Sequence, residues 1–414
     1  MYNNKPNGFR SSFRGANSNY SFNRPFRKNG NFNRPQRFGG RGTGSHESKL
    51  KGQVGIFIKK AATQSYLEQV SDKTFADFNL IGPLNANISN KGFEIPTPIQ
   101  AQTIQAILEG KDLIGLANTG TGKTGAFLIP IINNIFQDRS KSVFIVAPTR
   151  ELAVQINDEF KELSRGMQIY SSLVIGGSNM HRQISDLRRR PQVVIGTPGR
   201  LKDLIEQRVL HLQDFSIFVL DEVDLMVDIG FIHDVEFFIS LLPRERQSLF
   251  FSATIGPKIK DILNRFVTDP VTVSVKMQDT AENVEQDVIK IEVGKKVDQL
   301  HDLLIKDGFD KVLIFGKTKH GIEKLNRELE YRGFKVGAIH GNKSQGQRQR
   351  VLQSFKQDQI QVLLATDVAS RGLDIPNVSH VINYDLPQTF EDYIHRIGRT
   401  GRAGKKGIAL TFVE

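Results

Sequence analysis

The sequence lacks cysteine entirely and also lacks any long apolar run. Without cysteine the chain can form no disulfide and can offer no thiolate to zinc or to an iron–sulfur cluster. No apolar run comes near the ~18 residues that a membrane-spanning helix needs. The N-terminus also has no apolar stretch of the kind found in secretory signals. We therefore expect a protein with no membrane association and a cytoplasmic location.

Acidic residues are absent from residues 1–45, which hold nine Lys/Arg, nine Asn, seven Gly and eight Phe/Tyr. This segment, the tail, has no apolar period that could bury a face, so it cannot offset its ordering entropy and is expected to be disordered. It supplies nine of the twelve net positive charges of the chain. Because cations attract phosphates and aromatic rings stack on unpaired bases, we interpret the tail as RNA-binding. The alternative is a tail that only keeps the protein in solution.

From about residue 70 onward, short apolar runs alternate with longer amphipathic stretches. This alternation predicts buried parallel strands covered by helices on both faces. The runs predicted as strands of a first domain are Asp112–Leu116, Val143–Ala147, Val193–Gly196, Ile217–Leu220 and Leu249–Phe251. Those predicted for a second domain are Val312–Phe315, Val336–Ile339, Val362–Ala365, His380–Asn383 and Ile408–Phe412. We predict an α/β protein with a tail and lead-in at 1–70, domains at 71–276 and 284–414, and a linker at 277–283.

A glycine-rich segment follows the first predicted strand and opens a predicted helix. Its candidate phosphate-binding residues are Ala117, Asn118, Thr119, Gly120, Thr121, Gly122, Lys123 and Thr124. Its glycines allow backbone N–H groups to wrap a phosphate, Lys123 would reach the β- and γ-phosphates, and the Thr124 hydroxyl would bind Mg²⁺. Ala117 stands where the general pattern has glycine, and for this fragment alone a simple turn is the alternative.

An acidic segment, Asp221-Glu-Val-Asp224, ends the predicted strand Ile217–Leu220. Carboxylates at the carboxyl edge of a parallel sheet face the ligand crevice. Asp221 is placed to hold Mg²⁺, and Glu222 is placed to position and deprotonate an attacking water. An acidic strand end alone is usually just solvated. Two complementary half-sites, each at a strand end, favour a nucleotide-hydrolysing site.

Further motifs follow in a fixed order. They are Gly92–Gln100, Pro148–Ala153, Gly176-Gly177, Thr197–Arg200, Ser252–Thr254, Leu313–Phe315, Ala365–Asp374 and His395–Arg402. With the two half-sites, they make residues 73–414 resemble the DEAD-box branch of the superfamily 2 helicases. The resemblance implies two tandem RecA-like domains and an ATP-dependent RNA helicase that hydrolyses ATP, with ATP and Mg²⁺ as cofactors and RNA as a sequence-independent partner. We expect the protein to be a monomer.

Several residues gain a role in nucleotide binding from this resemblance. The Gln100 amide combines a donor and an acceptor, which matches the edge of adenine. Phe75 lies where the family places an aromatic ring against the base, although it could equally be a core residue. Asp374 matches the ribose contact. Arg399 and Arg402 match arginine fingers that act from the second domain on the γ-phosphate, the alternative being a solvated basic patch.

The remaining matched positions bind RNA or couple the domains. Those that match contacts to the nucleic-acid backbone are Arg150, Gly176, Gly177, Thr197, Arg200 and Thr366. Those that match positions coupling the two domains to the nucleotide are Asp224, Ser252, Thr254 and His395. Contacts of this kind carry no base code, so we expect binding without sequence preference.

Two departures from the family pattern are visible. Val223 replaces the usual alanine of the acidic motif, which leaves its three carboxylates in place. Related proteins usually continue past the last strand with a helix on the second domain, whereas this sequence ends at Glu414. Either the sequence is a fragment or its second domain is unusually bare.

The motifs leave three activities open. The first is an RNA-stimulated ATPase that separates short duplexes or strips proteins from RNA. The second is an ATP-gated RNA clamp or chaperone. The third and less favoured one is a DNA translocase of the same superfamily, against which Gln100 and the segment before it argue.

Deleting residues 1–45 should weaken RNA binding but leave kcat at saturating RNA nearly unchanged, because the tail holds no residue of the predicted ATP site. Each cation on a phosphate adds about 0.7 to the slope of log K against log salt on single strands. If about half of the nine cations engage, the slope should flatten by roughly 3. Affinities of both proteins for short and long RNA across a salt series measure this. Equal affinity and slope on long RNA would show a solubilising tail.

Overall fold

The computed structural model describes residues 54–58, 73–118, 120–256, 259–261, 266–275, 284–367, 375, 377–401 and 406–413. The predictions for the tail, the linker, Thr119, Asp374 and Arg402 lie outside these residues. Within them, no helix has both the length and the apolar character that crossing a bilayer requires.

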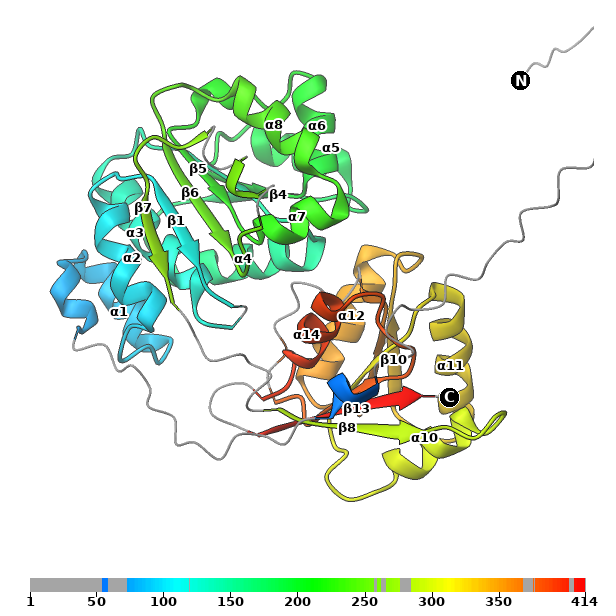
Figure 1. Ribbon diagram of the computed structural model, residues 1–414. Coiled ribbons are helices and arrows are strands. Elements are labelled where there is room, and N and C mark those ends of the chain that lie inside the picture. Colours follow the sequence, from blue (N-terminus) through cyan, green and yellow to red (C-terminus); the bar gives the residue numbers. More distant parts are fainter. Residues whose placement is uncertain are drawn as a thin grey trace, which may run out of the picture. The chain divides into compact units, whose positions relative to one another are not determined.

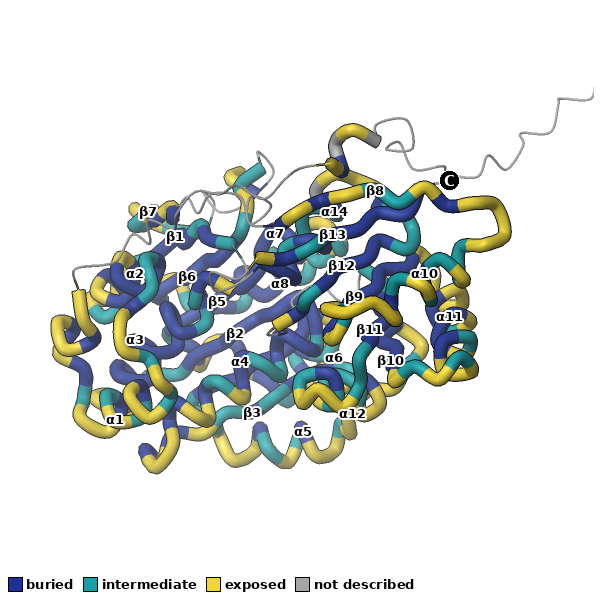
Figure 2. The backbone as a smooth tube through the Cα atoms, turned by 90° about the horizontal axis from the view of Figure 1, so that it is seen from below, coloured by how far each residue is buried: buried dark blue, intermediate teal, exposed yellow. Residues whose placement is uncertain are grey.

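Seven parallel strands form the sheet of the first domain, in the order β3-β4-β2-β5-β6-β1-β7, and the labels of Figures 1 and 2 together locate them. Their bounds are β1 Leu113–Leu116, β2 Val143–Val146, β3 Ser171–Val174, β4 Val193–Gly196, β5 Ile217–Leu220, β6 Gln247–Ser252 and β7 Val271–Ser274. All five predicted strands are present. β3 and β7 were not predicted, because they lie at the two edges of the sheet and their serine and threonine residues interrupt the apolar run.

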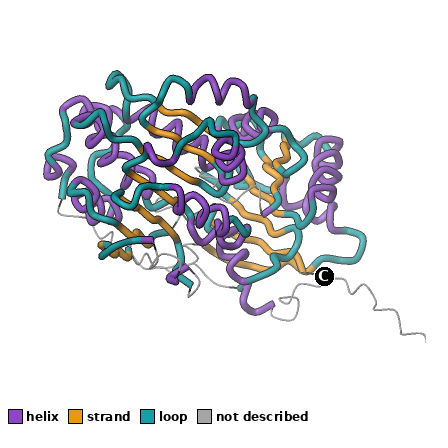
Figure 3. Tube along the Cα trace, turned by 90° about the horizontal axis from the view of Figure 1, so that it is seen from above, coloured by secondary structure: helices purple, strands orange, loops and turns teal. Residues whose placement is uncertain are grey.

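Helices cover both faces of this sheet because successive strand residues point to opposite sides. In β2, Val143 and Ile145 enter one core, whereas Phe144 and Val146 enter the other. Figure 3 shows the helices around the strands. The first core is closed by α1 Gly82–Asn90, α2 Pro98–Leu108, α3 Lys123–Gln137 and α4 Arg150–Leu163, with the 3-10 helix η2 Phe75–Phe78. The second is closed by α5 Met180–Leu187, α6 Pro198–Glu206, α7 Val223–Ile229, α8 Ile232–Leu241 and the 3-10 helix η3 Leu212–Asp214.

The second domain has a six-stranded parallel sheet in the order β10-β11-β9-β12-β13-β8. Its strands are β8 Val284–Lys290, β9 Val312–Phe315, β10 Val336–Ile339, β11 Val362–Ala365, β12 His380–Asn383 and β13 Gly407–Val413. Its helices are α10 Lys296–Leu304, α11 Lys319–Tyr331, α12 Gln345–Lys356 and α14 Phe390–Ile397. Figure 2 shows the buried inner strands. β8 was not predicted, since this edge strand alternates apolar and polar residues. The two parallel-sheet domains confirm the predicted fold class.

One short element lies within residues 1–70, the predicted tail and lead-in. Val54–Phe57 forms a 3-10 helix, η1, and the Phe57 side chain is fully buried. Its neighbours in space come from residues 284 to 409, far away in the sequence. The apolar run Val54–Ile58 is too short to show a period, and nothing in it indicates which distant residues receive Phe57.

Gly196, at the end of β4, is expected to tolerate no side chain. A Cβ atom there would lie 2.5 Å from the Val174 carbonyl oxygen and 2.7 Å from the Leu201 side chain. Gly196→Ala should therefore destabilise the first domain by about 1–3 kcal/mol, the usual cost of overpacking. Gly199 has nothing within 4 Å of the same atom. Gly199→Ala is the matched control and should stabilise its helix by up to about 1 kcal/mol. Urea unfolding measures both, and equal midpoints for the two variants would contradict the argument.

Candidate functional site

The strand order divides the carboxyl edge of the first sheet into two neighbouring halves. Strands β5, β6 and β1 are adjacent, and they lead into the acidic segment, the segment Ser252–Thr254 and the glycine-rich segment. Strands β3, β4 and β2 are also adjacent, and they lead into Gly176-Gly177, Thr197–Arg200 and Arg150. Because all strands run parallel, the candidate nucleotide residues and RNA residues share one edge, and the halves meet where β2 pairs with β5.

The glycine-rich segment contains a buried lysine side chain. Lys123 begins α3 and is 6% exposed, and its Nζ has no hydrogen-bond partner among the described residues. Gly122 before it has a φ of +90°, the left-handed conformation that favours glycine. A Cβ at Gly122 would lie 2.8 Å from the Gln100 Nε2 atom. A buried ammonium group at the start of a helix, beside a loop that requires glycine, has the chemistry of a phosphate site.

Gln100 links this loop to the start of α2. Its Nε2 donates to the Gly122 carbonyl oxygen at 3.1 Å, and its Oε1 accepts from the Thr97 amide at 3.0 Å. Both polar ends of the side chain are therefore used inside the protein here. Phe75 is buried in the core of the first domain, in agreement with the alternative that it is a core residue. Contact of either residue with adenine stays a prediction.

The acidic segment follows β5 with strained backbone and buried charge. Glu222 has φ +54° and ψ +56°, a left-handed conformation that is uncommon for a residue with a side chain. Its amide donates to the Asp221 Oδ1 atom at 3.0 Å. Burial raises the pKa of Asp221 to about 7, with Lys123 opposing this rise and Glu222 adding to it. The carboxylates of the acidic segment and the Lys123 ammonium group therefore lie close enough to interact at the carboxyl edge of the first sheet.

Asp224 connects the acidic segment to the end of β6. Its Oδ2 accepts three hydrogen bonds, from the Ala253 amide at 3.1 Å, the Thr254 amide at 2.9 Å and the Thr254 hydroxyl at 3.1 Å. The Asp224 amide donates to the Ser252 hydroxyl at 3.3 Å, and that hydroxyl donates to the Thr254 carbonyl oxygen at 2.7 Å. The structure therefore brings together three of the four residues predicted to couple the domains.

The predicted RNA contacts of the first domain also gather at one place. A Cβ at Gly176 would lie 2.9 Å from Arg150 Nη2, and one at Gly177 would lie 2.5 Å from Arg150 Nη1. The guanidinium group thus lies directly on the glycine backbone. Arg200 donates from Nη1 to the Ser178 carbonyl oxygen at 3.3 Å and to Gln183 Oε1 at 3.2 Å. Thr197 precedes the first residue of α6.

In the second domain the predicted residues follow the carboxyl ends of two strands. Thr366 comes directly after β11, and His395 lies on α14, which follows β12. Arg399 comes two residues after the end of α14, and its Nε donates to the His395 carbonyl oxygen at 3.3 Å. Arg399 is buried, which argues against the alternative of a solvated basic patch for this residue.

Sequence reasoning assigned no role to two ion pairs that join these motifs. Arg396 contacts Asp367 with Nε–Oδ1 and Nη2–Oδ2 distances of 2.5 and 2.8 Å. Arg348 on α12 donates to Glu151 Oε2 on α4 at 2.8 Å, and Gln345 donates to Glu151 Oε1 at 3.2 Å. Arg396, Asp367 and Glu151 lie within recognised motifs, whereas no local pattern marks Gln345 and Arg348.

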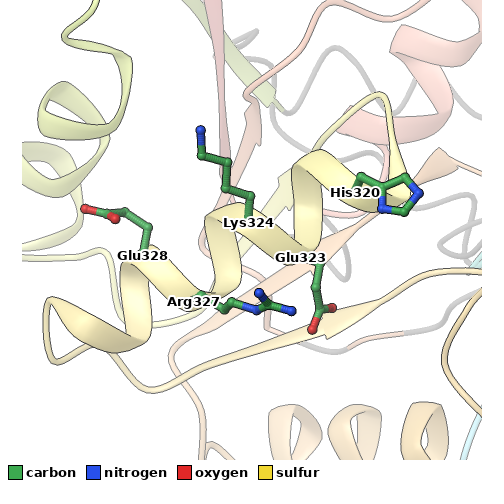
Figure 4. A pocket seen from close by; sticks show the side chains of 5 residues that line it. All are labelled: His320, Glu323, Lys324, Arg327 and Glu328. Atoms are coloured by element: carbon green, nitrogen blue, oxygen red, sulfur yellow. The ribbon is translucent and has the colours of Figure 1, made fainter.

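A cavity of about 340 Å³ lies elsewhere, along α11, and is lined by His320, Glu323, Lys324, Arg327 and Glu328 (Figure 4). Lys324 and Glu323 point away from each other, so the lining groups do not converge on one ligand. The Glu323 carboxylate is already bound to His340 Nε2 at 2.8 Å. This cavity contains none of the predicted site residues.

Comparison with known proteins agrees with the geometry. Residues 97–262 match the family profile "DEAD/DEAH box helicase", and residues 295–404 match the profile "Helicase conserved C-terminal domain". The chain is 46% identical over 342 residues to the ATP-dependent RNA helicase CshA of Listeria monocytogenes, covering 82% of this chain and 66% of that one. It is 45% identical to the DEAD-box ATP-dependent RNA helicase CshA of Bacillus subtilis, covering 82% of this chain and 69% of that one.

Solved structures show the same likeness. S. cerevisiae Dbp5 bound to RNA and ADP BeF3 aligns with a TM-score of 0.74 at 32% identity, covering 83% of this chain and 90% of that one. Mss116p bound to ssRNA and AMP-PNP aligns with a TM-score of 0.75 at 30% identity, covering 85% of this chain and 76% of that one.

Removing the Asp224 carboxylate should destabilise the first domain. Asp224→Ala would leave the amides of Ala253 and Thr254 without this acceptor, at a cost of about 1–3 kcal/mol. Thr254→Val, the matched control, removes only the hydroxyl hydrogen bond and should cost about 0.5–1.5 kcal/mol. Urea unfolding followed by circular dichroism compares the variants. A smaller loss for Asp224→Ala than for Thr254→Val would show that the carboxylate does not organise this turn.

Proposed function

The chain belongs to the DEAD-box family of ATP-dependent RNA helicases, and from this premise we propose that it uses ATP hydrolysis to open short RNA duplexes or to remodel RNA–protein complexes. The observation that carries the proposal is the shared carboxyl edge of the first sheet. Residues with phosphate chemistry follow β5, β6 and β1, and residues with backbone-binding chemistry follow β3, β4 and β2. A change at the nucleotide half would reach the RNA half through directly paired strands.

In the proposed reaction Lys123 binds the β- and γ-phosphates of ATP. Its burial without a hydrogen-bond partner in the described chain supports this role, because a buried ammonium group needs an anion. Glu222 positions the attacking water and takes its proton. The backbone strain at Glu222 supports an assignment to function, since strained residues concentrate at active sites.

Mg²⁺ is the cation proposed for this site, with Thr124 and Asp221 as the residues that would hold it. A hydroxyl and a carboxylate are oxygen ligands of the kind Mg²⁺ prefers, and the raised pKa of Asp221 marks a buried carboxylate that a cation would stabilise as an anion. No group of three or more acidic, His or Cys side chains suited to a metal gathers in the described part of the chain. The ion would therefore take its other ligands from phosphate and water. When bound, it neutralises charge on the transferred phosphate.

Beyond its two internal hydrogen bonds, Gln100 keeps one N–H donor and one carbonyl lone pair with which it could contact adenine. Such a contact would couple base binding to the phosphate loop, because one of the internal bonds ends on Gly122. Phe75, which is buried in the core of the first domain, is proposed to pack against the base. Asp374 is proposed to contact the ribose.

RNA is proposed to bind along Arg150, Gly176, Gly177, Thr197 and Arg200, with Thr366 contributing from the second domain. Guanidinium groups, hydroxyls and exposed glycine amides bind phosphate and sugar and do not read bases. Arg399 and Arg402 are proposed to complete the ATP site as arginine fingers, with His395 passing the state of the nucleotide between the domains. The cytoplasmic location and monomeric state remain predictions.

RNA-stimulated hydrolysis tests the proposal and the role of Glu222 together. The wild-type chain should hydrolyse ATP faster with single-stranded RNA than with DNA of the same sequence. Glu222→Gln keeps the size of the side chain but removes its basicity, so kcat should fall at least ~10²-fold while ATP and RNA still bind. Equal stimulation by DNA would favour a DNA translocase. Turnover near the wild-type rate in Glu222→Gln would remove Glu222 as the base.

A strand-separation assay distinguishes the two remaining activities, the helicase and the ATP-gated RNA clamp. A helicase should release one strand of a short RNA duplex during ATP turnover. An ATP-gated clamp should hold RNA with a non-hydrolysable ATP analogue and release no strand from the duplex.

A further inference from the structure

The short helix η1, Val54–Phe57, lies against the second domain although it precedes the first domain in the sequence (Figure 1). Phe57 is 0% exposed, whereas the next residue, Ile58, is 58% exposed. Gly55 is also exposed. Phe57 thus anchors the segment.

The site that receives this ring, here the docking site, consists of Val284 on β8, Ala409 on β13 and two residues of α14, Tyr393 and Ile397. The rings of Phe57 and Tyr393 have centroids 4.8 Å apart and planes at 63°, an edge-to-face arrangement favoured by aromatic pairs. The Tyr393 hydroxyl donates to Gln286 Oε1 on β8 at 2.9 Å. The contact is a packed, partly polar core.

The docking site includes the helix that leads into the proposed arginine fingers. Tyr393 and Ile397 are four positions apart on α14 and therefore lie on one face of it. Three positions after Tyr393, Arg396 is bound to Asp367 and stacks over the Phe315 ring at 5.1 Å. Arg399 follows two residues after α14 ends. Two contacts therefore hold the helix, that of Arg396 with Asp367 and that of Phe57 with Tyr393 and Ile397.

We propose that Val54–Phe57 is a docking segment and that Phe57 is a positioning residue for ATP hydrolysis. By filling the docking site it holds α14 in place, and through α14 it sets the position of Arg399. Protein interiors are close-packed, so removing a ring that a helix packs on allows the helix to shift. A displacement of 1 Å can cost ~10²-fold in rate. This proposal rests on the proposed function, since it requires Arg399 to act on ATP.

Docking itself can be measured without any enzyme assay. The sequence contains no tryptophan, so Phe57→Trp and Ile58→Trp each give the full chain a single fluorescent reporter. The reporter at position 57 should show blue-shifted emission and resist quenching by acrylamide, while the one at 58 should be quenched freely. Adding Tyr393→Ala to Phe57→Trp should expose the buried reporter, with circular dichroism used to verify folding. Equal quenching of the two single reporters would overturn the proposal.

The positioning role is tested by kinetics. Phe57→Ala should lower kcat of RNA-stimulated hydrolysis by about 3- to 30-fold, with KM for ATP within about 2-fold of wild type, because Arg399 acts on the transition state. Phe57→Leu, which refills part of the docking site, should recover most of the rate. Ile58→Ala is the matched control in the same segment and should change neither value.

Each outcome decides the proposal. An unchanged kcat in Phe57→Ala, with the reporter at 57 buried, would leave a contact without a positioning role and overturn it. Should Phe57→Ala fail to fold, Phe57→Leu replaces it and is expected to lose a smaller part of kcat; no loss would also overturn the proposal. If the wild-type chain shows no RNA-stimulated hydrolysis, the proposed function fails, and the reporters still decide whether the segment docks.

Discussion

A parallel sheet buried on both faces leaves its functional side chains only one place to gather, and both domains are built under this constraint. The strand residues of the first sheet alternate between two apolar cores, so no polar group can be placed along the strands without being buried. Polar residues therefore collect where the strands end. Since every strand runs the same way, the ends that lead into helices meet at one edge.

Within that edge, two left-handed backbone positions and the contacts of one carboxylate set the geometry. Gly122 supplies a left-handed turn at which Gln100 can approach the backbone, and Glu222 adopts a left-handed conformation itself. Asp224 then joins the two strand ends, because one carboxylate oxygen accepts from two amides and a hydroxyl. Hydrogen bonds to an ionised carboxylate are stronger than hydrogen bonds to a neutral acceptor, so Asp224 holds the two strand ends together more firmly than a neutral side chain would.

The strands at the centre of each sheet could be predicted because their apolar runs are continuous, as in Ile217–Leu220 and Val362–Ala365. Edge strands such as Val284–Lys290 escaped prediction because only one of their faces is buried. The candidate site was predictable wherever a motif names its residue, as for Lys123 and Asp224. The Glu151–Arg348 pair was not, since its partners lie 197 positions apart and no local pattern records such a contact. Burial of Phe57 was hidden for the same reason.

The position of Phe57 also bears on how the polypeptide is divided. The second domain is discontinuous in sequence. Phe57 supplies part of its apolar interior, and the other residues of that interior begin at Val284. Along the sequence, the chain therefore contributes first to the interior of the second domain, then forms the first domain, and then forms the rest of the second. A fragment that starts at residue 284 would be missing a side chain of its own interior, so cleavage between the two sheets does not yield two complete folding units.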